Sequence, residues 1–160
     1  MKKIIVGKNK TLKLNNVLGI NIKLEDLSQT DVFIEKMINV IKVNGAEQMG
    51  PLIQHSYVSN DEDNPIRIEL LVQCDRFLNK IEEPFIMRPI IRVSNCMYCR
   101  YIGLEENQGI GYDKIKVEAY ENDIDLTGNT YTIYVDSNEN DGTVVTDIFM
   151  EKKYDEKKGI

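Results

Sequence analysis

One stretch of this sequence occurs twice in related form. YVSNDEDNPIRIELLV begins at Tyr57 and YVDSNENDGTVVTDIFM begins at Tyr134, and each passes through a polar loop into a strand-like run with one acid. These acids, Glu69 and Asp147, are 78 residues apart. A half-chain of this size would leave a sheet edge and a sheet face uncovered, so we expect two copies to join into one wider sheet.

The predicted elements repeat in the same order. Apolar spacing and turn residues indicate a strand over 11–24, a helix from Ser28 or Thr30 to Asn44-Gly45, and strands over 52–58 and 66–72. The second copy comprises a strand over 90–104, a helix over 110–123, and strands over 126–135 and 143–150. Three further landmark pairs, Gly50 and Gly128, Tyr57 and Tyr134, and Leu24 and Leu104, are 77 to 80 residues apart.

These observations predict an α+β fold, in which a duplicated strand-helix-strand-strand unit forms one curved antiparallel sheet with the helices on one face. We expect a single domain over 1–160. Its parts would be a first repeat over about 11–73, a connector over 74–89, a second repeat over about 90–151 and a charged tail over 152–160.

Charge and hydropathy restrict the partners. The net charge of −6 and the scattered lysines argue against direct nucleic-acid binding. No apolar run approaches the roughly 20 residues that span a bilayer. The start, MKKIIVGKNK, is too short in apolar residues for a signal peptide. We therefore expect a cytoplasmic protein without a membrane partner, and its oligomeric state stays open.

The cysteines and the single histidine offer little for metal or redox chemistry. Cys96 and Cys99 form a lone Cys-x-x-Cys pair in a strand-like context, whereas zinc needs about four ligands and a redox pair normally begins a helix. His55 is the only histidine. We predict that Cys96 and Cys99 bind no metal and are not a redox pair, and we expect no cofactor.

The two strand acids are the main candidates for a site. Ile66, Ile68, Leu70 and Val72 alternate with Arg67, Glu69 and Leu71, and Asp147 shares a strand face with Val145 and Phe149. If the apolar faces pack against the helices, both acids line the concave side of the sheet. The alternative is that Glu69 pairs with Arg67 or another strand residue and that both acids are solvated.

The second half of the chain resembles the GyrI-like effector-binding domain. The resemblance rests on Gly128, Tyr131-Thr132-Ile133-Tyr134, the turn SNENDG, and Thr146-Asp147-Ile148-Phe149, which follow one another in the family's order. It implies two repeats in one curved sheet and, for this chain, a stand-alone member. The sequence departs from the family where Asp147 replaces the usual Glu and where Glu151 replaces the usual Pro.

The resemblance implies a protein that binds a small organic effector, cationic or amphipathic, on the concave sheet face. The candidate ligand-binding residues are Asp147, Glu69, Tyr131, Phe149, Tyr57 and Tyr112. The family pattern favours Tyr131 over Tyr134 as the tyrosine facing the ligand. Two alternatives stay open. One is a protein-interaction module, such as an inhibitor or a chaperone or immunity-type protein of a toxin or secretion locus. The other is a small hydrolase using Asp147 and Tyr131.

Overall fold

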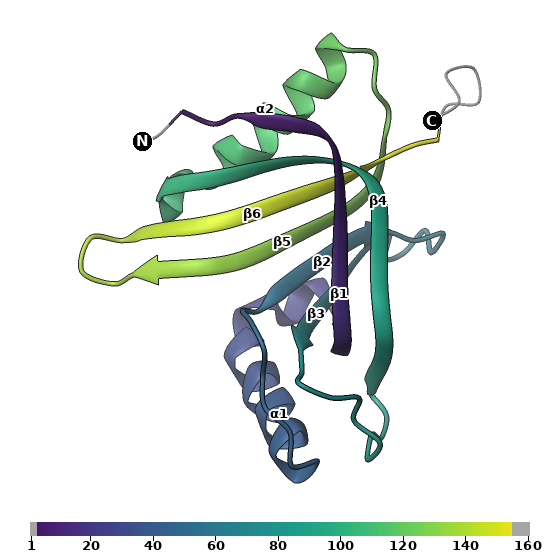
Figure 1. Cartoon of the computed structure of the whole chain (residues 1–160). Coiled ribbons are helices and arrows are strands. Elements are labelled where there is room, and N and C mark those ends of the chain that lie inside the picture. Colours follow the sequence, from purple (N-terminus) through teal and green to yellow (C-terminus); the bar gives the residue numbers. More distant parts are fainter. Residues whose placement is uncertain (1–2, 155–160) are drawn as a thin grey trace. The chain divides into compact units, whose positions relative to one another are not determined.

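The computed structural model describes residues 3–154 and contains the same order of elements twice (Figure 1). The first set is β1 (Val6–Ile22), η1 (Leu24–Gln29), α1 (Thr30–Val43), β2 (Ile53–Val58) and β3 (Ile66–Gln73). The second set is β4 (Phe85–Leu104), η2 (Glu105–Asn107), α2 (Gly109–Glu121), β5 (Leu126–Asn138) and β6 (Thr143–Lys152). The predicted elements are confirmed, although β1 and β4 begin five residues earlier than predicted. Residues 155–160 of the predicted tail lie outside the described residues.

The chain divides into two compact units. We call residues 13–92 the N-terminal unit, and residues 3–12 with 93–154 the C-terminal unit. Strands β1 and β4 each contribute residues to both units. Within residues 3–154, no helix is long and apolar enough to cross a membrane.

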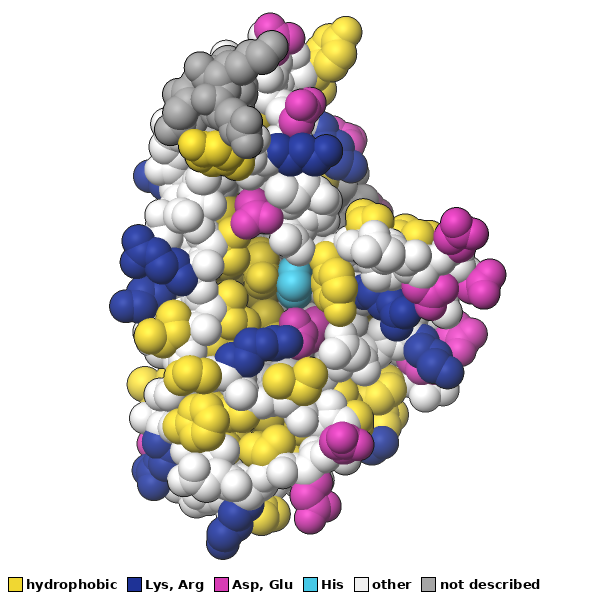
Figure 2. All heavy atoms as spheres, turned by 90° about the vertical axis from the view of Figure 1, so that its right-hand side faces the viewer, with side chains coloured by type: hydrophobic (Ala, Val, Ile, Leu, Met, Phe, Trp, Pro, Cys, Tyr) yellow, Lys and Arg dark blue, Asp and Glu magenta, His cyan; other side chains and the backbone are white. Residues whose placement is uncertain are grey.

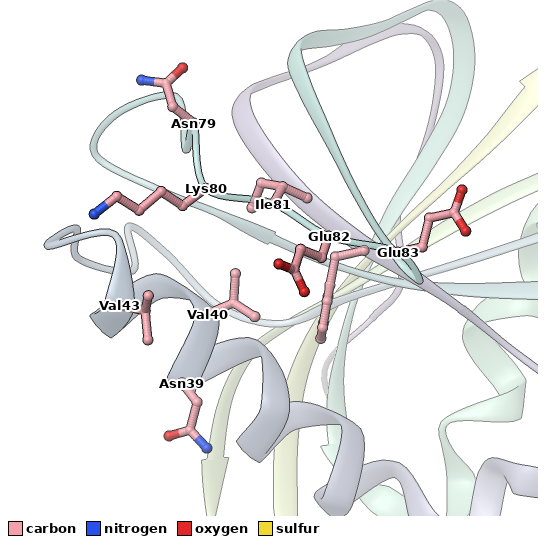
Figure 3. A pocket seen from close by; sticks show the side chains of 9 residues that line it. Asn39, Val40, Val43, Asn79, Lys80, Ile81, Glu82 and Glu83 are labelled. Atoms are coloured by element: carbon pink, nitrogen blue, oxygen red, sulfur yellow. The ribbon is translucent and has the colours of Figure 1, made fainter.

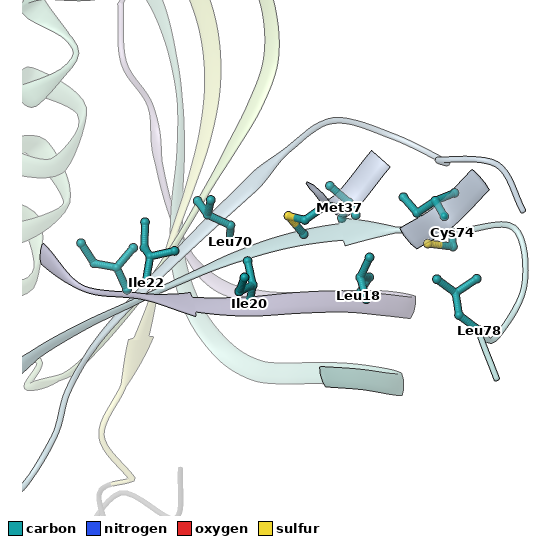
Figure 4. Packing of buried hydrophobic residues seen from close by; sticks show 10 residues of the cluster. Leu18, Ile20, Ile22, Met37, Leu70, Cys74 and Leu78 are labelled. Carbon is teal, nitrogen blue, oxygen red and sulfur yellow. The ribbon is translucent and has the colours of Figure 1, made fainter. Parts of the chain in front are cut away.

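In the N-terminal unit, β3 lies between β1 and β2 and pairs with both in antiparallel orientation. Alternate residues of β3, among them Ile68 and Leu70, pack with Leu18 and Ile20 of β1 against Met37 of α1 (Figure 4). The helix therefore covers one face of this sheet, as the apolar alternation predicts.

Ile66 is an exception to that prediction. It was expected on the helix-covered face, but it is 50% exposed. The reason is its position, because Ile66 is the first residue of β3 and pairs with Val58 at the end of β2, next to the polar loop.

The C-terminal unit has the corresponding arrangement. Here β6 lies between β4 and β5, again with antiparallel pairing. Its helix-facing residues form a core with Ile115 and Ala119 of α2, and this core includes Met97, Cys99, Tyr101, Ile148 and Met150. The α+β fold of antiparallel strands with helices on one face is thus present in each unit.

The helix start and the bend in β1 have local causes. The helix was predicted to begin at Ser28 or Thr30, and α1 begins at Thr30 with Gln29 as N-cap and no side-chain capping bond. Thr30 instead donates its hydroxyl to the Leu27 carbonyl of the preceding 3-10 turn, at 2.7 Å. The predicted bend near Asn16 corresponds to a left-handed residue with φ 49°, and Asn95 of β4 has φ 62°. Asparagine adopts this conformation more readily than most residues.

Core packing predicts different costs for two apolar residues on β3. Leu70→Ala is expected to lower the free energy of unfolding by about 2–5 kcal/mol, because Leu70 is fully buried against the helix side of the sheet. Ile66→Ala, half exposed on the same strand, is expected to cost less than about 1 kcal/mol. Urea denaturation of both variants measures the difference, and equal losses would contradict this packing.

Candidate functional site

Glu69 occupies the middle of the N-terminal sheet. Its neighbours in sequence, Ile68 and Leu70, pack on the helix side, so Glu69 projects from the opposite face. It lies opposite Asn21 on β1 and His55 on β2. We call this the acid face of the N-terminal unit. Glu69 is only 3% exposed, so its charge requires compensation from nearby groups.

Two side chains compensate the Glu69 carboxylate. Arg88 of β4 places Nη1 2.8 Å from Oε2, and His55 places Nδ1 3.2 Å from Oε1. The Arg88 contact is an ion pair without hydrogen-bond geometry, since neither Nη1 nor Oε2 has a directed hydrogen bond. The His55 ring stacks on Tyr57, with ring centroids 4.9 Å apart. Figure 2 shows the chain's one histidine, in cyan, reaching the surface beside acidic and basic side chains.

The alternative that Glu69 pairs with another strand residue is confirmed, by His55 of β2 and Arg88 of β4, whereas the two other parts of that alternative are wrong. Arg67 does not pair with Glu69 but with Asp61 of the neighbouring loop, at 3.0 Å. Glu69 is also not solvated, because it is buried beneath its partners.

Gly19 makes room for the Glu69–Arg88 pair. It lies on β1 opposite Leu71, and a Cβ atom at this position would be 2.9 Å from Leu71 Cδ2 and 3.0 Å from Glu69 Oε2. The same atom would be 3.5 Å from Arg88 Nη1. Any side chain at Gly19 would therefore crowd the carboxylate and its partner.

The electrostatics favour the charged form of Glu69. Burial raises the pKa of its carboxyl, but the His55 hydrogen bond and the Arg88 charge together outweigh burial and hold this pKa below its ordinary value. The cluster of Glu69, Arg88 and His55 is thus built around an ionised carboxylate.

Asp147 is the corresponding acid of the C-terminal unit. Arg100 of β4, directly opposite, donates to both carboxylate oxygens: Nε to Oδ1 at 2.8 Å and Nη2 to Oδ2 at 2.9 Å. The Tyr98 hydroxyl donates to Oδ1 at 2.8 Å. Asp147 therefore accepts three hydrogen bonds from two side chains, and the bidentate Arg100 guanidinium neutralises its charge.

Three aromatic residues share the strand face of this carboxylate. The rings of Tyr98 and Phe149 have centroids 4.8 Å apart, and Tyr131 of β5 lies opposite Phe149 on β6. Burial raises the pKa of Tyr98 to about 12, helped by its hydrogen bond to Asp147, so this phenol stays protonated as a donor. We call this set, with Arg100, the acid face of the C-terminal unit.

The structure assembles only part of the predicted set. Tyr131, Phe149 and Asp147 share the acid face of the C-terminal unit, and Tyr57 and Glu69 share that of the N-terminal unit. Tyr112 lies elsewhere: it belongs to α2, packs against the helix-side core, and its hydroxyl bonds Thr132. Sequence reasoning missed the partners His55, Arg88, Tyr98 and Arg100. The alternation of Tyr98 and Arg100 with buried Met97, Cys99 and Tyr101 was an available signal.

Tyr57 and Tyr134, which begin the two related stretches, lie on opposite strand faces. Tyr57 pairs with Arg67, on the face of Glu69, whereas Tyr134 pairs with Thr146, one residue from Asp147. Burial raises the pKa of Tyr134 to about 12, and nearby Tyr112 of α2 contributes. The register thus agrees with the preference for Tyr131 over Tyr134.

Cys96 and Cys99 are free, buried thiols on β4. Burial raises the pKa of each to about 11, whereas a reactive thiol needs a lowered pKa. Within the part of the chain that the structure describes, no group of three or more His, Cys, Asp or Glu side chains could hold a metal ion. That Cys96 and Cys99 bind no metal and are not a redox pair stays a prediction.

Comparison with solved structures identifies the fold. EcmrR, solved in a complex with DNA, matches with TM-score 0.74 and 13% identity over 95% of this chain, which spans 58% of the EcmrR chain. The EcmrR C-terminal domain matches with TM-score 0.70 and 16% identity, over 96% of this chain and 98% of that domain. The chain has the GyrI-like fold. SAV2435, solved bound to tetraphenylphosphonium, matches with TM-score 0.50 and 9% identity, over 92% of this chain and 94% of that chain. No protein-family profile matches the sequence, and no curated protein matches it significantly.

The resemblance to the GyrI-like domain is therefore confirmed as a fold. Identities of 9% to 16% establish the architecture alone. They carry no assignment of ligand or activity to this chain.

Glu69 is expected to contribute stability that depends on pH. Glu69→Gln should lower the free energy of unfolding at pH 7 by about 2–3 kcal/mol, because Arg88 then faces a neutral amide. Since the folded pKa is lowered, this stabilisation is complete above the unfolded pKa of about 4.3 and is lost as the pH falls through the folded value. Denaturant unfolding from pH 7 to acid pH measures the difference in the free energy of unfolding between the wild type and Glu69→Gln, which should become smaller as the pH falls. The exposed Glu62→Gln is the control. If this difference in the free energy of unfolding became larger towards acid pH, Glu69 would not be a stabilising ionised carboxylate.

Gly19→Ala tests the crowding at the same carboxylate. It is expected to cost about 1–3 kcal/mol of stability, because the added methyl overlaps Leu71 and Glu69. Gly109→Ala, whose Cβ would meet nothing within 4 Å, is the control and should not destabilise. Thermal unfolding of the two variants provides the comparison, and a neutral Gly19→Ala would contradict the close packing.

Proposed function

We propose that this chain binds a small organic molecule on the acid face of the C-terminal unit. The observation that carries the proposal is that Tyr98, Phe149 and Tyr131 share with a charge-matched Asp147 the sheet face that α2 does not cover. Aromatic rings recognise apolar and planar molecules, and a hydroxyl-bearing ring adds a hydrogen-bonding group. In this proposal the chain acts as a single GyrI-like domain that senses or sequesters an effector.

The pairing of Asp147 sets the character of the ligand. Arg100 already occupies both carboxylate oxygens, so a cationic ligand would not meet a free negative charge. Arg100 is 48% exposed, however, and could move aside at modest cost. We therefore propose a ligand held first by its contact with the rings, with a cationic group favoured through ring faces and through Asp147. The tetraphenylphosphonium bound to SAV2435 is a molecule of this kind.

Glu69 and Tyr57 form a separate candidate site on the acid face of the N-terminal unit. Glu69 is buried, ion-paired with Arg88 and hydrogen-bonded to His55, so a direct ligand contact would first have to displace one of these partners. Hydrolysis is not proposed, because Asp147 bonds the Tyr98 hydroxyl rather than acting as an uncommitted base beside Tyr131.

The test is calorimetric titration of the whole chain with tetraphenylphosphonium. We expect Phe149→Ala to weaken the affinity about tenfold or more, because one ring of the set is lost. Phe77→Ala removes a 43% exposed ring of the other unit and serves as the matched control.

Native mass spectrometry of protein purified from bacterial cells extends the test to other ligands. A retained small organic molecule that Phe149→Ala loses and Phe77→Ala keeps would support the proposal. The proposal would be refuted if the purified protein retained no small molecule and calorimetry detected no binding of tetraphenylphosphonium.

A further inference from the structure

A groove of about 680 Å³ lies in the N-terminal unit between α1 and the connector that leads into β4 (Figure 3). The groove belongs to neither acid face, because Val40 and Phe85, which line its floor, pack against the core on the helix side of the sheet. The residues that line it are Asn39, Val40, Val43, Asn79, Lys80, Ile81, Glu82, Glu83 and Phe85.

The groove is held in shape by Asn44, the residue that ends α1. Its side chain accepts the Lys80 backbone N–H at 2.9 Å and donates to the Lys80 carbonyl at 3.1 Å. It also donates to the Val40 carbonyl at 2.8 Å. Leu78 is fully buried in the core just before this point. These hydrogen bonds fix the connector against the C-terminal end of α1. The groove between them therefore has a defined shape.

The lining suits an elongated occupant. Val40, Ile81 and Phe85 are half-buried and form an apolar floor, while the remaining six lining residues are exposed. Val43 is 69% exposed although it lies at the end of this floor. Small-molecule sites enclose most of their ligand. A shallow groove with an apolar floor instead covers one side of a polypeptide, whose anchoring side chains fill it.

Charge indicates the sign of the partner. Glu82 and Glu83 are adjacent and exposed, and neither forms an ion pair with another of residues 3–154. Figure 3 shows Glu82 reaching from the connector towards Val40 on the helix. Lys80 provides one positive charge, so the rim keeps a net negative charge, as does the whole chain at −6.

We propose that this groove binds a partner polypeptide segment in which apolar side chains stand next to a lysine or arginine. The apolar side chains would lie against Val40, Ile81 and Phe85. The basic residue would meet Glu82, which reaches towards the groove, while Glu83 adds negative charge at its rim (Figure 3).

The experiment is an NMR chemical-shift titration of the full chain with a short capped peptide of lysine, leucine and alanine. The expected shifts centre on Val43 and Ile81. Glu82→Gln/Glu83→Gln should weaken the peptide affinity about five- to tenfold, which corresponds to the loss of an exposed ion pair and of the negative charge beside it. Val43→Ser should weaken it as well.

Matched variants separate the groove from general charge. Glu105→Gln/Glu106→Gln removes another adjacent pair of exposed acids, and Val117→Ser changes a 54% exposed valine on α2. Both should bind as the wild type does. The proposal is overturned if these controls lose as much affinity as the groove variants, or if the same peptide with glutamate for lysine binds equally well. It is also overturned if n-octylammonium binds the groove as tightly as the peptide, which would make this a small-molecule site.

Discussion

The pairing of each strand carboxylate with an arginine of β4 is the interaction on which both candidate sites depend. Glu69 and Asp147 project from the middle strand of their sheets, and burial of either charge would be unfavourable without a partner. Arg88 and Arg100 supply that partner from one continuous strand. As a result, each carboxylate already has a cationic partner. Recognition of a ligand would therefore depend mainly on the rings and hydrogen-bonding groups beside the carboxylate.

Period-two alternation was sufficient to predict which strand residues face the helices, because burying Ile68, Leu70 and Ile148 strongly favours one register. The same pattern could not name the partners of the acids. Alternation specifies a face but not the neighbouring strand, and Arg88 was assigned to the connector over 74–89, whose last five residues in fact begin β4. The importance of Gly19 was equally hidden, since it follows from a Cβ position that only coordinates reveal.

The spacing of the repeat contained one further clue. Glu69 and Asp147 are 78 residues apart, whereas Tyr57 and Tyr134 are 77 apart. One residue of difference moves a strand side chain to the other face. The register confirms the consequence, because Tyr57 shares its face with Glu69 while Tyr134 faces the side of Thr146. A register shift between Tyr134 and Asp136 interrupts the pairing just beyond, so similar letters in the two copies do not imply equivalent positions.

The two copies have diverged in chemistry while keeping the same pairing scheme. Opposite the acid, the N-terminal unit has Asn21 and His55 where the C-terminal unit has Arg100 and Ile133. Two residues earlier on β1 and on β4, Gly19 corresponds to Tyr98. A glycine there leaves space for Arg88 to reach Glu69, which buries a polar cluster. A tyrosine there fills the space with a ring and bonds the acid directly. The C-terminal unit therefore has more aromatic residues on its acid face, and this difference at a single strand position is the physical reason for proposing the ligand site in that unit.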